Sequence, residues 1–142
     1  MSFQSSNDIL NAAVELLSGT LSNHATVIRH FPDRIKPLPL KNVTITVGSI
    51  GRNISSKYLG DRLSDTLHGK EVALQIEVAV YVPLTKNSAL AFTALDDAVN
   101  TLINDGRFEI KEVKYGKISA NRDTGSFELH ANLTSIFYET EG

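Results

Sequence analysis

Residues 72–83 read Val-Ala-Leu-Gln-Ile-Glu-Val-Ala-Val-Tyr-Val-Pro, and this stretch decides the fold. Its even-numbered positions from 72 to 82 are all aliphatic, whereas the odd-numbered positions mix Gln75, Glu77 and Tyr81 with alanine. A period of two residues is typical of a β-strand that packs one face on a core. We therefore predict a central strand over 72–82, which ends at Pro83 because proline cannot continue a sheet ladder.

Two segments have helical periodicity. The first predicted helix covers 6–18, with polar capping residues before it and Gly19 as its stop. The second covers about 88–104, is capped by Asn87 or Ser88 and stops at Gly106. Its expected buried stripe consists of Ala91, Phe92, Leu95, Val99, Leu102 and Ile103.

The remaining strands are shorter or less regular. Residues 43–47 alternate cleanly, 25–31 predict a short strand, and 32–41 predict an extended connector because it holds three prolines. A strand over 108–115 changes phase near 111–112, which indicates a bulge. The residue types at 121–125 predict a turn. Apolar and polar side chains alternate over 127–138, which predicts a long closing strand in a hairpin with the strand before it.

This element order predicts an α+β fold, a mostly antiparallel sheet with two helices packed on one face. The 142 residues fit a single domain over 1–142. Residues 48–70 have no clear apolar period and predict a long loop. We expect this loop to be functional, disordered until assembly, or partly helical near 59–67.

The composition excludes several kinds of chemistry. The chain has no cysteine, so disulfides and thiolate nucleophiles are absent, and none of its four histidines has metal-ligand spacing. Asp96 and Asp97 point about 100° apart on a helix and do not form an acid–base pair. We predict no enzyme activity, no catalytic residue, no metal and no cofactor.

Location and partners follow from charge and hydropathy. The N-terminal residues lack the basic and apolar runs of a signal peptide, and no stretch approaches the roughly 20 apolar residues of a membrane span. We therefore expect synthesis in the cytoplasm and no membrane partner. The net charge of −2 gives no basic excess, so we expect no sequence-specific nucleic-acid partner.

The charges are unevenly distributed. Residues 1–70 carry eight Lys/Arg and five Asp/Glu, whereas 71–142 carry six and eleven. Opposed charges on one chain favour head-to-tail association into a ring, although a mixed solvated surface would show the same split. The candidate contacts to a neighbouring subunit or partner are Arg52, Lys57, Arg62 and Lys70.

The second half of the chain resembles a known family. The aliphatic strand ending Val-Tyr-Val-Pro at 80–83 is followed by a polar break, a helix over 89–104, Phe-Glu-Ile at 108–110 and the hairpin ending in 127–138. This arrangement resembles the tail-terminator, or tail-completion, proteins of long-tailed bacteriophages. It is also similar to the matching collar component of phage-tail-like contractile, bacteriocin-like particles.

The resemblance implies a structural role. Such proteins form a hexameric ring of copies of themselves that caps the tail tube and ends its polymerisation. Their partners are the tube protein, the sheath protein in contractile systems and a head-completion protein in true phages. The resemblance therefore implies a component of a virion or tail-like particle that is assembled in the bacterial host cytoplasm.

Two alternatives stay open. One is another tail component, such as a neck or baseplate subunit. The other is an enzyme or small-ligand module with its substrate near Arg52, Lys57 and His68. For the structural role, the second candidate interface is the polar face of the sheet around Glu77, Tyr81 and His130.

Overall fold

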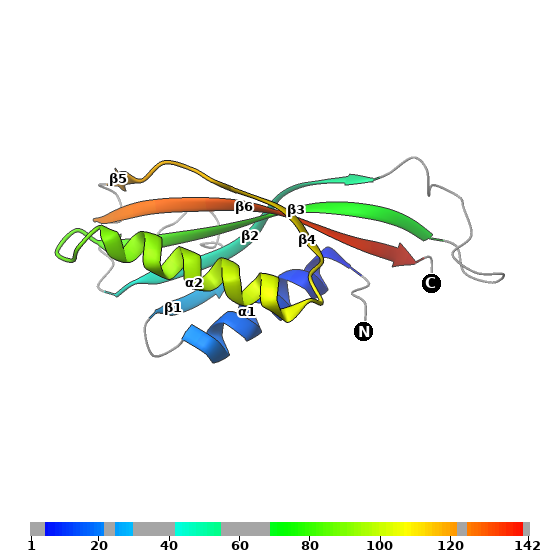
Figure 1. The fold of residues 1–142 in the computed structure, drawn as a ribbon, viewed down its shortest axis with the longest axis horizontal. Coiled ribbons are helices and arrows are strands. Elements are labelled where there is room, and N and C mark those ends of the chain that lie inside the picture. The colour runs from blue at the N-terminus through cyan, green and yellow to red at the C-terminus, as the bar shows by residue number, and fades with distance from the viewer. Residues whose placement is uncertain (1–4, 22–24, 30–41, 55–68, 122–124, 141–142) are drawn as a thin grey trace.

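The computed structural model describes residues 5–21, 25–29, 42–54, 69–121 and 125–140. Two helices, α1 (Ser6–Leu21) and α2 (Ala89–Asp105), lie on one face of a mostly antiparallel sheet (Figure 1). The strands of this sheet are β1 (Thr26–Arg29), β2 (Thr44–Ile54), β3 (Gly69–Pro83), β4 (Ile110–Tyr115), β5 (Ser119–Asn121) and β6 (Ser126–Thr140). The predicted α+β fold with both helices on one face is confirmed.

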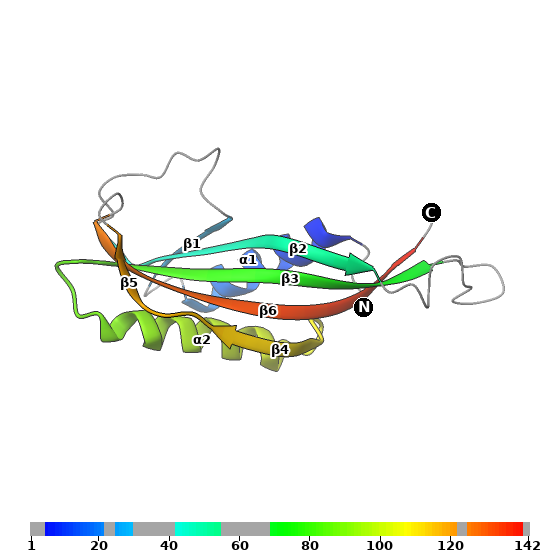
Figure 2. The ribbon, with the colours of Figure 1, turned by 90° about the horizontal axis from the view of Figure 1, so that it is seen from above.

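The sheet is built around the antiparallel pair β3 and β6, which run side by side along its length (Figure 2). β2 pairs with the other side of β3, and β1 is added to β2 in parallel at one edge. At the opposite edge β4 and β5 both pair with β6, so the order is β1-β2-β3-β6-β4. The closing strand therefore forms the predicted hairpin pairing and also joins the centre of the sheet.

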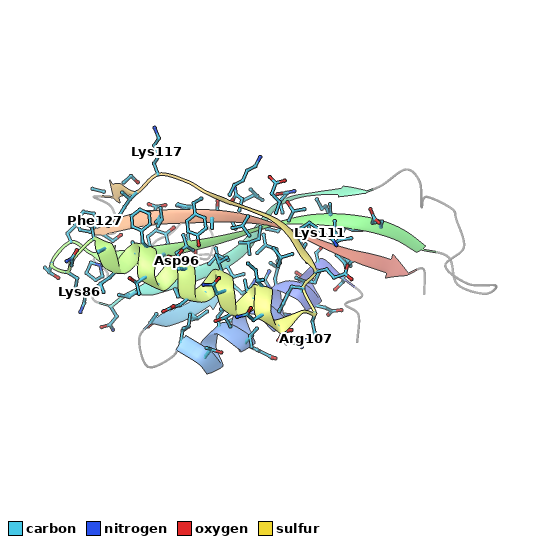
Figure 3. All side chains as sticks on the ribbon, in the orientation of Figure 1. Lys86, Asp96, Arg107, Lys111, Lys117 and Phe127 are labelled. Atoms are coloured by element: carbon cyan, nitrogen blue, oxygen red, sulfur yellow. The ribbon has the colours of Figure 1, made fainter. Side chains whose placement is uncertain are left out.

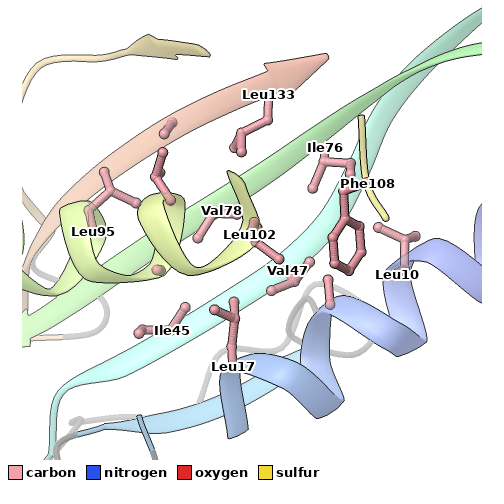
Figure 4. Close-up of a cluster of buried hydrophobic side chains, with 14 of the residues drawn as sticks. Leu10, Leu17, Ile45, Val47, Ile76, Val78, Leu95, Leu102, Phe108 and Leu133 are labelled. Carbon is pink, nitrogen blue, oxygen red and sulfur yellow. The ribbon is translucent and has the colours of Figure 1, made fainter. Parts of the chain in front are cut away.

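One face of this sheet forms the core with the helices (Figure 4). The even-numbered side chains of β3 and the odd-numbered side chains of β6 point toward the helices. α1 contacts β1 and β2, whereas α2 contacts β3 and β6, and the two helices touch each other. The largest fully buried side chains include Ile9, Leu17, Ile45, Leu74, Ile76, Leu95, Leu102, Phe108, Leu129 and Leu133.

The two helix stops had different outcomes. Gly106 ends α2 in the left-handed conformation at φ 80°, as predicted. Gly19 does not end α1, which continues to Leu21, a buried residue. Burial of Leu21 extends the apolar stripe by one turn and offsets the weak helix propensity of glycine.

The second helix buries a narrower stripe than its sequence indicated. Ala91, Leu95, Ala98, Val99 and Leu102 are buried. Phe92 and Ile103, which were expected in the stripe, are 44% and 45% exposed. Both lie on one side of α2 and not on the face that packs on the sheet. Around the helix axis, positions 92 and 103 are rotated away from the direction of Leu95.

The predicted loop over 48–70 is wrong at both ends. β2 continues to Ile54 and β3 begins at Gly69, so within this range 55–68 lie outside the described residues. A register shift between Ser49 and Gly51 changes which residues of β2 point to the helices. This bulge breaks the period of two, and the extended strand therefore looked like a loop in the sequence. The predicted connector over 32–41, the helical alternative near 59–67 and the middle of the turn over 121–125 also lie outside the described residues.

Between α2 and β4 the chain turns through a well-anchored segment. The strand starts at Ile110 and not at Phe108, and the predicted bulge is confirmed between Ile110 and Glu112. Phe108 is fully buried, and its carbonyl oxygen accepts a hydrogen bond from the hydroxyl of Ser135 on β6. Arg107 binds Asp105 through two hydrogen bonds of 2.6 and 3.2 Å and lies over the ring of Phe108.

The central position of β3 gives a stability prediction. Val78 is fully buried on the helix face, so Val78→Ala should lower the free energy of unfolding by about 1–3 kcal/mol, measured by denaturant titration. Val14→Ala is the matched control, since Val14 is half-buried on α1 and alanine is the better helix former. Equal losses in the two variants would contradict the central placement of β3.

The two glycines give a second stability prediction. Gly19 lies inside α1 with open space where a Cβ would stand, so Gly19→Ala should raise the free energy of unfolding by about 0.5–1 kcal/mol. Gly106 also has open space, but its positive φ should make Gly106→Ala cost about 1–2 kcal/mol. Opposite signs in thermal melts are expected. A loss at Gly19 would place the end of α1 there after all.

Candidate functional site

The open face of the sheet carries the most structured group of polar side chains. We use this name for the part of that face formed by Gln75, Glu77, Ala79, Tyr81, Glu128, His130, Asn132 and Thr134, whose side chains point away from the helices; Ala79 and Tyr81 among them are buried. Strand alternation places them there, since their neighbours on each strand point into the core. The sequence predicted the odd-numbered residues of β3 on this face.

At the centre of the open face His130 is held between two carboxylates. Its Nδ1 lies 3.4 Å from Oε1 of Glu77 on the neighbouring strand. Its Nε2 contacts Oε1 of Glu128, two residues earlier on its own strand. The ring of Tyr81 stands edge-on to the imidazole, with the centroids 6.3 Å apart. We call Glu77, Tyr81, Glu128 and His130 the histidine cluster.

The surroundings of the cluster determine its charge state. The hydrogen bond to Glu77 raises the pKa of His130, burial opposes this, and Glu128 adds to it. Burial, with the charges of Glu128 and Glu77, raises the pKa of Tyr81 above its usual range, so this residue is a neutral phenol. With His130 protonated, the cluster carries one positive and two negative charges. The cluster thus brings two carboxylates, an imidazole and a phenol together on one face of the sheet.

Next to the cluster the open face continues toward β4. Thr134 donates a hydrogen bond of 3.2 Å to the side-chain oxygen of Gln75. Asn132 lies between Glu77 on β3 and Lys114 on β4 in the strand register. Its buried Oδ1 has no hydrogen-bond partner among the residues that the structure describes.

The contacts of His130 on the open face are with carboxylates. Within the described ranges no group of three His, Cys, Asp or Glu side chains is arranged to hold a metal ion. His130 contacts carboxylates through both ring nitrogens, and neither nitrogen contacts a hydroxyl nucleophile in the hydrogen bonds that it makes.

The basic residues predicted as an interface occupy different settings. Arg52 lies in β2 and points to the helix side, where its Nη1 donates a 3.2 Å hydrogen bond to Ser6 at the start of α1. Lys70 lies in β3, opposite Glu139 of β6 in the register. Lys57, Arg62 and His68 lie outside the described residues. The structure therefore does not show these basic residues together.

Sequence reasoning missed one functional-looking contact. The hydroxyl of Tyr115 on β4 donates a 2.6 Å hydrogen bond to Oδ1 of Asp96 on α2. Burial, with this hydrogen bond, raises the pKa of Tyr115 to about 12. The two residues are 19 positions apart, and only the placement of α2 beside β4 brings them together. Figure 3 shows Asp96 on α2 and Lys111 on β4 along this side of the molecule.

No protein-family model matches the chain, and no curated protein matches it. Within the described residues, no helix has the length and apolarity that crossing a membrane requires.

The histidine cluster gives a prediction of pH dependence. Because the folded pKa of His130 is raised above the ordinary value of 6.5, its stabilisation is fully present below that pH and is lost as pH rises through the folded pKa. The difference in free energy of unfolding between the wild type and His130→Gln should therefore be largest between about pH 5 and 6.5 and shrink above it.

Denaturant titrations over this pH range measure that difference. The control is Lys114→Gln, which removes an exposed cation from the same face. A difference that stays constant, or grows with pH, would show that His130 is neutral in the folded state.

Proposed function

We propose that this chain is a structural subunit of a bacteriophage tail or of a phage-tail-like contractile particle. In this role a ring of its copies, six by analogy with the resembling family, caps the tail tube and ends its polymerisation. The partners are the tube protein, the sheath protein in a contractile particle and a head-completion protein in a complete phage. The role is structural and needs no cofactor.

The observation that carries the proposal is the order of elements over the residues that gave the resemblance. β3 ends at Pro83, a short polar break leads into α2, and β4, β5 and β6 follow. These bounds match the strand, helix and hairpin on which the resemblance rests. The match concerns the arrangement of elements, which is the level at which the family resemblance was stated.

The open face supports a ring contact of the head-to-tail type. The histidine cluster contains two carboxylates, Glu77 and Glu128, whereas the candidate interface residues Arg52, Lys57, Arg62 and Lys70 are basic. When one patch of each copy binds a different patch of the next copy, the copies form a closed ring if the rotations between them add up to a full turn.

The decisive experiment is deletion of the gene in a strain that produces the particle. We expect tubes of irregular length by electron microscopy and restoration of uniform length by the wild-type gene. Uniform tubes without the gene would contradict the proposal. Uniform tubes that lack a neck or baseplate would assign the alternative role as another tail component.

A charge reversal tests the basic residues in the same assay. Lys57→Glu with Arg62→Glu should lengthen the distribution of tube lengths, because a contact worth about 0–1 kcal/mol per pair is repeated around a ring. Arg52 is left unchanged because it binds Ser6 on α1. The control pair is Lys86→Glu with Lys117→Glu, which are exposed elsewhere and should have no effect. Equal effects of the two pairs would remove the basic residues from the interface.

A further inference from the structure

Strand β4 is a sheet edge, and the main-chain groups of alternate residues point outward. It pairs with β6 on one side, and no described strand lies on the other. The N–H of Gly116 donates a 2.8 Å hydrogen bond to the carbonyl of His130. In an antiparallel ladder, residues alternate between pointing toward and away from the partner. The main-chain groups of Glu112 and Lys114 therefore face β6, and those of Val113 and Tyr115 face outward.

We propose that this edge binds the same edge of a second copy of the chain, and that Val113 pairs with Val113 of that copy on a two-fold axis. The two strands are antiparallel and join two sheets into one. The contact goes beyond the proposed function and does not rest on it. A head-to-tail ring cannot use it between neighbours, because both copies contribute the same patch.

Charge complementarity selects both the occupant and the register. When Val113 pairs with its copy, Glu112 lies opposite Lys114 of the partner twice. A shift of the centre to residue 114 would place Lys114 opposite Lys114, and a shift to 112 would place Glu112 opposite Glu112. If the two-fold axis passed between two residues of β4, the outward-facing main-chain groups of one copy would lie opposite inward-facing groups of the other. Among the centres at 112, 113 and 114, the register at Val113 is the one that pairs opposite charges, and it joins outward-facing main-chain groups.

The exposed flank of α2 lies on the same side of the molecule. Phe92, Asp96 and Ile103 are spaced by four and seven residues and share this flank. The hydrogen bond from Tyr115 to Asp96 shows that the flank is turned toward β4. Phe92, Ile103 and Tyr115 are 44, 45 and 42% exposed. A two-fold axis perpendicular to the sheet places the α2 of the partner next to this flank, where the apolar side chains would be covered.

The test uses the purified full-length protein and measures mass in solution by analytical ultracentrifugation. We expect a dimer for the wild type. Glu112→Lys alone and Lys114→Glu alone should each weaken the dimer by about tenfold or more, because they create like-charge pairs. A mixture of these two variants should restore dimers that contain one copy of each, because every cross-strand pair is then opposite in charge.

The mixture separates an intermolecular effect from a loss of the Glu112–Lys114 ion pair within one chain, which mixing cannot restore. A second comparison uses Phe92→Ser, which should weaken the dimer, and Leu90→Ser, which lies on the other side of α2 at 41% exposure and should not. Thermal melts confirm that each variant folds.

Three results would overturn the proposal. They are a monomer at every concentration, a larger ring in place of a dimer, and a dimer that is insensitive to both charge changes. A dimer in solution with no effect of gene deletion on tube length would support this contact and reject the capping role. A monomer in solution, together with irregular tubes after gene deletion, would reject this contact and support the capping role.

Discussion

The pairing of β3 with β6 is the constraint on which the rest of the structure depends. These strands align from Gly69 opposite Thr140 to Pro83 opposite Ser126 without a register shift. The side chains alternate with a period of two, so a slip by one residue would turn Glu77 and His130 toward the helices. The aliphatic face of β3 thereby determines which residues of both strands are buried. The sheet neighbours on either side then extend this pair.

This alternation separates three surfaces with different chemistry. The helix face is apolar and closed by α1 and α2. The open face holds the histidine cluster, whose members come from two strands and meet only because the register is fixed. The edge at β4 offers main-chain groups and alternating charges. Each surface is a consequence of the same register, although only the helix face contributes a large buried apolar area.

Much of the fold could be predicted from the sequence, because strong local periodicity identified β3, β6 and both helices. The left-handed Gly106 was also predictable, since a glycine after an apolar stripe is the usual helix stop. The far half of β2 was not, because its bulge at Ser49 and Gly51 reverses the periodic pattern. The exposure of Phe92 and Ile103 was missed because the width of a buried stripe depends on how the helix sits on the sheet.

The candidate site was less predictable than the fold. Glu77, Tyr81 and His130 were placed on one polar face by alternation alone, but the sequence did not identify Glu128 as the second carboxylate on His130. That contact lies between positions two apart on one strand face, and such pairs are common on solvated strands. The difference here is Glu77 on the adjacent strand, which is 53 positions away and is brought close only by the register.

The two proposed contacts use different symmetry and different surfaces, and this makes them compatible with one fold. A two-fold axis through Val113, perpendicular to the sheet, keeps both open faces on the same side of the joined sheet. Each histidine cluster therefore stays available while the edges are paired. Conversely, a head-to-tail contact on the open face leaves β4 with outward-facing main-chain groups. A short edge strand with alternating charges favours one register and resists open-ended pairing. The edge contact therefore joins two copies and no more. The open face can still bind a different patch on another chain.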